Sequence, residues 1–246
     1  MIVKLNAKRI DFMKTFKSGL FYFFYEETPR RKVLFDRKTA ELSFRENEKC
    51  LEIESSRDLS NEKGLLERIR FCLGLDENLK EFHEICRDDP VLKDYIDRIE
   101  TTRIFSAFSD FEALVGAIIS QNNSYKNYRR KMLEVYLKLN FDPKKFTESN
   151  LEGMGLGYKV PFLATLAKDF GKKDLQAIRG IGPYSVQLYE IFQKRNYSAF
   201  YIDCLTEKIM RQRYGINKDF EEESWRLWGK WRGLAEAYLQ RFFEKK

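Results

Sequence analysis

The spacing of apolar residues divides the chain into an N-terminal part with a period of two and a longer part with a helical period. Before residue 61, short aromatic or alternating runs are separated by charged and turn-forming residues, as in antiparallel sheets. The strands predicted are Leu20–Tyr25, Lys32–Asp36, Ala40–Phe44 and Cys50–Ser55. We therefore expect an α+β fold, with a small antiparallel β-sheet domain over 1–60 and an all-helical domain over 61–246.

Helical spacing starts at about Asn61 and continues to the C-terminal segment. The strongest pattern is FEALVGAIIS, which follows Ser109-Asp110 and is apolar at nearly every position, so it predicts a buried core helix. Ser124 is a favoured N-cap for the amphipathic segment YKNYRRKMLEVYLKL. Three tryptophans lie three residues apart near the C-terminus, where core packing is favoured over base stacking. They are Trp225, Trp228 and Trp231.

A glycine loop followed by a helix start is the most informative local pattern. In the segment LQAIRGIGPYSVQLYEIF, Gly180-Ile181-Gly182 predicts a tight loop, because both glycines can take positive φ and leave room for close backbone approach. Pro183 suits the first position of a helix. The exposed N–H groups at such a helix end attract anions such as phosphate. About twenty residues later, Asp203 is a favoured N-cap for a helix over Cys204–Arg213, where capping bonds favour its carboxylate form.

The overall composition agrees with a polyanionic partner and excludes several kinds of site. The chain has 246 residues and a formal net charge of +7. Its one histidine, His83, lies in a charged segment, which excludes a Ser-His-Asp triad and a histidine-rich metal site. The four cysteines are scattered, as for free thiols in a reducing compartment. No signal peptide or membrane-length apolar run is visible, so we expect an intracellular protein.

The hairpin and the spaced aspartate together resemble the helix-hairpin-helix (HhH-GPD) DNA glycosylase superfamily. The resemblance covers roughly 61–246, with features of both the 3-methyladenine DNA glycosylase II type and the 8-oxoguanine DNA glycosylase type. It implies a base excision repair enzyme that hydrolyses the N-glycosidic bond of a flipped-out damaged purine. Asp203 takes the place of the catalytic residue, and its carboxylate would stabilise positive charge on the sugar.

The resemblance also implies the positions of further site residues. In the base pocket it places Tyr184, Gln121 and Leu205. In contact with DNA it places Gly180, Gly182, Ser185, Asn122, Asn123, Tyr158 and Lys159. It implies no organic cofactor and no metal held by side chains. A monovalent cation could bind the backbone carbonyls of Gln176, Ile178 and Ile181.

The residues that would select the substrate point in two directions. Relatives with lyase activity carry a lysine at the position of Tyr184, so the chain is expected to be monofunctional, and Tyr184 and Leu205 favour an alkylated base. The segments SQNNS and GLGYK resemble the 8-oxoguanine group instead, so an 8-oxoguanine glycosylase with possible lyase activity is the alternative. A non-catalytic, structure-specific DNA-binding module is the alternative from another class. The expected partner is damaged double-stranded DNA, bound by a monomer.

Overall fold

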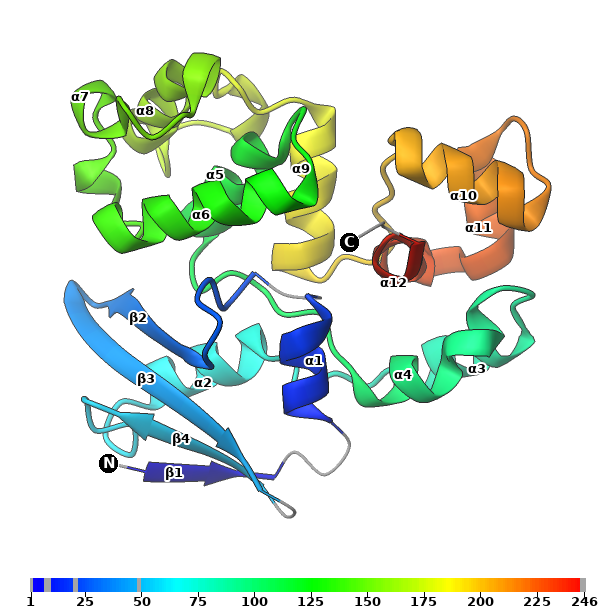
Figure 1. Cartoon of the computed structure of the whole chain (residues 1–246), viewed down its shortest axis with the longest axis horizontal. Coiled ribbons are helices and arrows are strands. Elements are labelled where there is room, and N and C mark those ends of the chain that lie inside the picture. The colour runs from blue at the N-terminus through cyan, green and yellow to red at the C-terminus, as the bar shows by residue number, and fades with distance from the viewer. Residues whose placement is uncertain (1, 7–9, 20–21, 48–49, 244–246) are drawn as a thin grey trace.

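A computed structural model of the chain describes residues 2–6, 10–19, 22–47 and 50–243. Over these residues the strands form one antiparallel sheet in the order β1-β4-β3-β2 (Figure 1). They are β1 (Ile2–Leu5), β2 (Arg30–Phe35), β3 (Lys38–Glu46) and β4 (Leu51–Ser55). Val33 pairs with Ala40, and Phe44 with Ile53, so that these buried side chains build one apolar face. The predicted class, α+β with an N-terminal antiparallel sheet, is confirmed.

The first predicted strand is wrong. Leu20 and Phe21 lie outside the described residues, and Tyr22–Tyr25 is irregular. Phe23 and Phe24 are fully buried, and no alternation of inward and outward side chains remains to support a strand. Helix α1 (Phe12–Ser18), capped by Asp11, precedes this segment and was not predicted.

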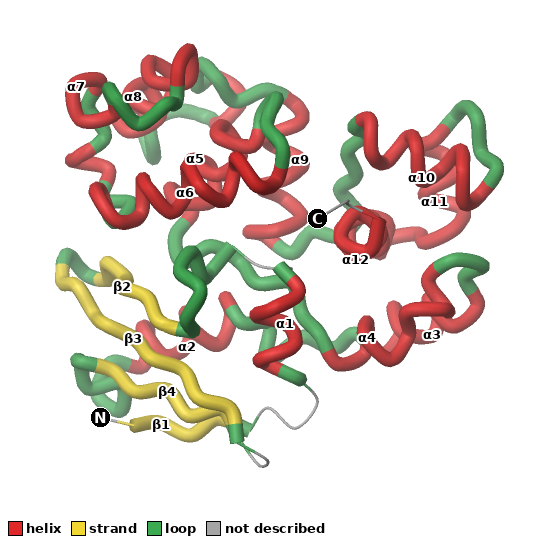
Figure 2. Tube along the Cα trace, viewed as in Figure 1, coloured by secondary structure: helices red, strands yellow, loops and turns green. Residues whose placement is uncertain are grey.

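The helices form two groups beside the sheet (Figure 2). One contains α5 (Asp110–Ser120), α6 (Tyr125–Leu139), α7 (Glu148–Leu151), α8 (Val160–Asp169) and α9 (Pro183–Tyr189). The other contains α3 (Lys80–Asp88), α4 (Ile96–Thr101), α10 (Cys204–Tyr214), α11 (Phe220–Trp228) and α12 (Arg232–Phe243). Short turns connect them: η1 (Leu92–Tyr95), η2 (Pro143–Lys145), η3 (Gly157–Lys159), η4 (Leu175–Ala177), η6 (Gly229–Trp231) and the π-helical η5 (Glu190–Lys194), which continues α9.

The two helices predicted most strongly form as expected. The Ser109 hydroxyl accepts a hydrogen bond from the Glu112 backbone N–H, and Ser124 caps α6 through the Asn127 N–H. Residues 111–119 of α5 are all buried, which explains why all of them except Glu112 are apolar or glycine. Helix α5 is thus the central element against which α6, α8 and α9 pack.

Among the residues that the structure describes, buried apolar side chains gather in three clusters, one for each helical group and one under the sheet. The sheet's cluster includes α2 (Lys63–Cys72), so its core crosses the domain boundary expected at residue 60, and that division stays a prediction. Trp228 is buried in the second helical group, where its indole N–H donates to Asp89, whereas Trp225 is 53% exposed. None of the helices in the described ranges combines the length and apolar character that crossing a bilayer requires.

Candidate active site

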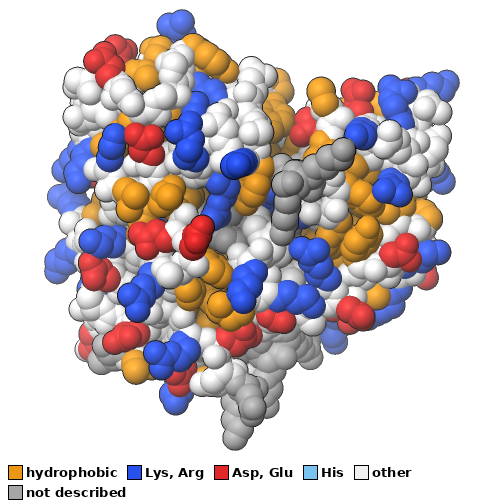
Figure 3. Space-filling model, in the orientation of Figure 1, with side chains coloured by type: hydrophobic (Ala, Val, Ile, Leu, Met, Phe, Trp, Pro, Cys, Tyr) orange, Lys and Arg blue, Asp and Glu red, His pale blue; other side chains and the backbone are white. Residues whose placement is uncertain are grey.

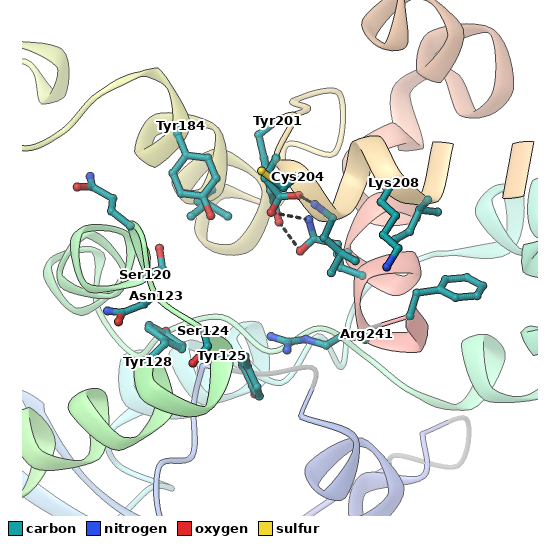
Figure 4. Close-up of a pocket in the computed structure, with 18 of the residues that line it drawn as sticks. Ser120, Asn123, Ser124, Tyr125, Tyr128, Tyr184, Tyr201, Cys204, Lys208 and Arg241 are labelled. Atoms are coloured by element: carbon teal, nitrogen blue, oxygen red, sulfur yellow. Dashed lines mark hydrogen bonds between the residues drawn. The ribbon is translucent and has the colours of Figure 1, made fainter. Parts of the chain in front are cut away.

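A cleft of about 1320 Å³ lies between the two helical groups (Figure 3). One side comes from the end of α5, the start of α6 and α9, and the other from α10 and α12 (Figure 4). Six of the residues predicted from the sequence line it: Gln121, Asn122, Asn123, Tyr184, Asp203 and Leu205. Residues separated by more than 80 positions in the sequence are thus brought to one cavity.

Asp203 is the N-cap of α10 and is held at both oxygens. Its Oδ1 accepts hydrogen bonds from the backbone N–H groups of Leu205 (3.0 Å) and Thr206 (2.8 Å). Its Oδ2 accepts a third from the side-chain amide of Gln240, at 3.2 Å. The carboxylate is half-buried and lines the cleft. It is therefore a fixed negative group at the end of a helix dipole, in contact with the cavity.

Residues behind Asp203 form a chain of hydrogen bonds that no sequence motif marks. The Gln240 amide also donates to the Thr206 hydroxyl (2.9 Å), and its oxygen accepts from Tyr201 (3.0 Å). The Thr206 hydroxyl in turn donates to Glu236, at 2.7 Å. Burial, and after it the charge of Asp203, raise the pKa of Glu236 well above its usual range. These contacts fix the rotamer of Gln240 and hence the direction of Asp203.

The two hairpin glycines have different backbone torsions. Gly180 has φ of 97°, and a Cβ there would lie 2.6 Å from Cβ of Phe162, so only glycine fits. Gly182 is extended, with φ of −98° and ψ of −179°, so of the two glycines only Gly180 takes the positive φ that both can adopt. A Cβ on Gly182 would meet no atom within 4 Å. Gly180 therefore shapes the loop, whereas Gly182 leaves open space before α9.

Gln121 connects the end of α5 to the hairpin. Its amide donates to the Gly180 carbonyl at 2.8 Å and to the Ser185 hydroxyl at 2.9 Å. Ser185 is fully buried. The Ser185 hydroxyl therefore supports the hairpin from inside, and the expected contact of Ser185 with DNA stays a prediction.

The turn between α5 and α6 places one amide outward and one inward. Asn122 is exposed, has φ of 50°, and donates to the hydroxyl of Tyr158 at 3.2 Å. Tyr158 is itself 56% exposed. Asn123 turns back and donates to the Ile119 carbonyl at 2.6 Å. Asn122 and Tyr158 thus form an exposed pair at the mouth of the cleft, whereas the amide of Asn123 holds the turn.

Lys159 is buried beneath the turn that carries Asn122. It is 3% exposed, and its ammonium group donates to the backbone carbonyls of Ile119 (2.7 Å) and Gln121 at the end of α5. Burial, with a smaller effect of Lys131, lowers the pKa of Lys159 to about 8. In this structure the amine supports the turn that carries Asn122, and the expected contact of Lys159 with DNA stays a prediction.

Aromatic and basic side chains surround the space in front of Asp203. Tyr184 packs edge-on against Tyr201, with ring centroids 5.2 Å apart, and burial is the main cause that raises the pKa of Tyr184. Other aromatic lining residues are Tyr22, Tyr125, Tyr128 and Phe192. Basic lining residues are Lys126, Lys208, Arg213 and Arg241. The cleft can therefore hold a flat ring and attract phosphate at its rim.

The expected cation site lies in the turn before the hairpin. Gln176 belongs to η4, and the Ile178 carbonyl accepts a hydrogen bond from the Ile181 N–H at 3.1 Å. No cluster of three or more His, Cys, Asp or Glu side chains suited to a metal occurs in the described ranges. The monovalent cation stays a prediction.

The sheet, the two helical groups and the hairpin beside the cleft together have the fold of the helix-hairpin-helix DNA glycosylases. The 3-methyladenine DNA glycosylase from Archaeoglobus fulgidus superimposes with a TM-score of 0.79 at 18% identity, covering 100% of both chains. The 8-oxoguanine glycosylase/lyase of Clostridium acetobutylicum, bound to double-stranded DNA with cytosine opposite 8-oxoguanine, gives 0.74 at 18% identity. That match covers 98% of this chain and 97% of the other.

At these identities the likeness establishes the fold. No protein-family model matches the chain, and a search by sequence among curated proteins finds no relative. The chemistry must therefore be argued from the cleft itself.

Proposed function

We propose that the protein is a DNA N-glycosylase of base excision repair that hydrolyses the N-glycosidic bond of a damaged purine. The observation that carries the proposal is Asp203, whose carboxylate is fixed by three hydrogen bonds at the wall of a cleft large enough for a base and its sugar. Cleavage of the bond develops positive charge on the sugar, and a preorganised carboxylate stabilises that charge most in the transition state.

The nucleophile in this proposal is water. A covalent lyase route needs an amine next to the sugar, and Tyr184 offers a phenol at the position where lyase relatives carry lysine. Asp203 is placed to orient the water or to accept its proton. The product would be a free base and an intact abasic site.

An alkylated purine is the favoured substrate. Several alkylated purines carry a positive charge, and the aromatic walls formed by Tyr22, Tyr184 and Phe192 offer electron-rich faces to a cation. The A. fulgidus enzyme with the same fold acts on 3-methyladenine by its name. Oxidised guanine is the second candidate, because Asn122 and Tyr158 form an exposed pair that suits insertion next to an orphaned base.

A non-catalytic DNA-binding module explains less of the molecule. Such a module needs the hairpin and the basic rim, but it gives no reason for an aspartate held at both oxygens inside a cavity. We further propose that the protein acts as a monomer inside the cell, where double-stranded DNA is its partner.

A panel of duplexes, each with one lesion, tests the function. We expect release of a free alkylated purine, with alkali needed to break the strand at the abasic site. Sodium borohydride should trap no covalent protein–DNA adduct, because Tyr184 cannot form an imine. Release of 8-oxoguanine alone would favour the second candidate, and efficient trapping would show that a lysine acts as nucleophile. If no lesion is excised while damaged DNA still binds, the non-catalytic module is the better description.

Gly182→Val tests the hairpin as a phosphate site. We expect duplex binding to weaken roughly tenfold to hundredfold, because one hydrogen bond to a charged group contributes about 1.5–3 kcal/mol and 1.4 kcal/mol is a factor of ten. The extended backbone and the open space at Gly182 accept a valine without refolding. Fluorescence anisotropy on undamaged DNA at several salt concentrations measures the effect, with the unfolding midpoint as the control. Unchanged affinity would remove the hairpin from DNA binding.

A further inference from the structure

An arginine of the hairpin carries an exposed positive charge. Arg179 lies directly before Gly180, and its guanidinium forms no ion pair or hydrogen bond with the residues that the structure describes. Its Cζ lies over the ring of Phe162, 5.5 Å from the ring centroid. The face of an aromatic ring attracts a cation, and the N–H groups of the guanidinium stay available to an anion. The hairpin therefore presents a side chain that can bind a negatively charged partner.

Phe162, near the start of α8, also supports the backbone of the hairpin. A Cβ at Gly180 would lie 2.6 Å from Cβ and 2.7 Å from Cγ of Phe162, so the hairpin passes directly over this side chain. Phe162 is partly buried and packs against the core of the first helical group. Its position is thus fixed from both sides, and it in turn limits where the guanidinium of Arg179 can lie.

The same ring connects Arg179 to the exposed pair at the mouth of the cleft. Tyr158 packs edge-on against Phe162, with ring centroids 6.1 Å apart. The hydroxyl of Tyr158 accepts the hydrogen bond from the Asn122 amide described above. Asn122, Tyr158 and Arg179 are all exposed, so their side chains form one continuous polar surface from the cleft to the hairpin.

We propose that Arg179 binds a phosphate of the DNA backbone, and that Phe162 holds its guanidinium in a fixed position relative to Asn122 and Tyr158. The inference rests on the proposed function and adds a side-chain contact to the backbone N–H groups of the hairpin. The planar guanidinium of arginine matches two oxygens of a phosphate with two parallel hydrogen bonds. Phosphate contacts fix the register of a protein on the duplex. A phosphate bound at Arg179 therefore sets where Asn122 and Tyr158 meet the base stack.

Arg179→Gln removes the charge and tests the contact on undamaged duplex DNA. We expect affinity to fall about eightfold at about 0.1 M salt, because one counterion fewer is released on binding. For the same reason the slope of log affinity against log salt concentration should become shallower by about 0.9. Arg179→Lys keeps the charge and should keep the slope. Fluorescence anisotropy over a series of salt concentrations measures both quantities.

Arg37→Gln is the matched control. Arg37 is also exposed and forms no ion pair in the described part of the chain, but it lies in the turn between β2 and β3 and does not line the cleft. The control makes the same change in net charge and should bind the duplex like the wild type.

Phe162→Leu tests the supporting ring. This variant should weaken duplex binding in the wild-type background and have a clearly smaller effect in the Arg179→Gln background, because the ring acts on binding through the guanidinium. A change in packing alone would have the same effect in both backgrounds. The unfolding midpoint of each variant shows that it is folded.

The outcomes separate the inference from the proposed function. Binding by Arg179→Gln that equals that of Arg37→Gln, or that is weaker with an unchanged salt slope, overturns the inference alone. Equal effects of Phe162→Leu in both backgrounds also overturn it. A wild-type protein that binds no duplex overturns the proposed function and the inference together. If the wild type binds with the expected contribution of Arg179 but excises no lesion, only the proposed function fails.

Discussion

Replacement of Asp203 by asparagine should reduce single-turnover excision by roughly 10²–10³-fold while duplex binding is retained. Removing one preorganised electrostatic group from an active site typically lowers the rate by this factor. Asparagine keeps the shape and is as good an N-cap as aspartate, so the bonds from the Leu205 and Thr206 N–H groups should persist. The variant loses the negative charge in front of the sugar, together with the oxygen that accepts from the Gln240 amide. Quenched-flow or manual single-turnover assays with excess protein measure the rate.

Asp11→Asn provides the matched control for this variant. Asp11 is the N-cap of α1, where its side chain accepts from the Lys14 N–H at 2.6 Å, and it does not line the cleft. The control should excise at the wild-type rate. A near-normal rate for the Asp203 variant would mean that another group stabilises the developing charge.

The second large effect concerns stability and the junction between sheet and helices. Arg31→Met should lower the free energy of unfolding by about 3–5 kcal/mol, because it leaves a buried charge without its partner. Arg31 on β2 forms a two-pronged ion pair with Glu112 on α5, at 2.9 and 3.0 Å, and each side chain is 2% exposed. Urea unfolding followed by circular dichroism measures the change.

The double variant Arg31→Met/Glu112→Met distinguishes a buried charge from lost packing. It should be more stable than Arg31→Met alone, since apolar residues often replace a buried ion pair at little cost. A double variant as unstable as the sum of the two single changes would show that packing of the long side chains dominates.

The parts of the fold that were predicted correctly depend on local signals. Helix α5 is apolar at nearly every position and begins after a serine cap, and both features can be recognised from consecutive residues. The same holds for Asp203, whose capping role needs only the next three residues. The tight loop at Gly180 follows from the glycine itself, which can take the positive φ that the structure shows there.

The errors arise where distant residues decide the outcome. The burial of Lys159 could not be predicted from the glycine-rich turn before it, because the carbonyls that its ammonium group contacts lie at the end of α5. Gln240 contacts Asp203, and Glu236 contacts Thr206, although each pair is at least 30 positions apart in the sequence. No sequence motif marks either contact. The aromatic run before β2 satisfies strand propensity, but burial of Phe23 and Phe24 on neighbouring positions overrides it.

That same aromatic run determines how separable the parts of the chain are. Phe23 and Phe24 belong to the cluster under the sheet, Tyr25 belongs to the cluster of the first helical group, and Tyr22 reaches Phe192 and the cleft. A shortened protein over 61–246 would keep Asp203 and the hairpin but would lose part of the cleft floor. The segment between α1 and β2 is therefore shared by the sheet, the first helical group and the cleft, so the sheet cannot be removed without changing the wall of the cavity.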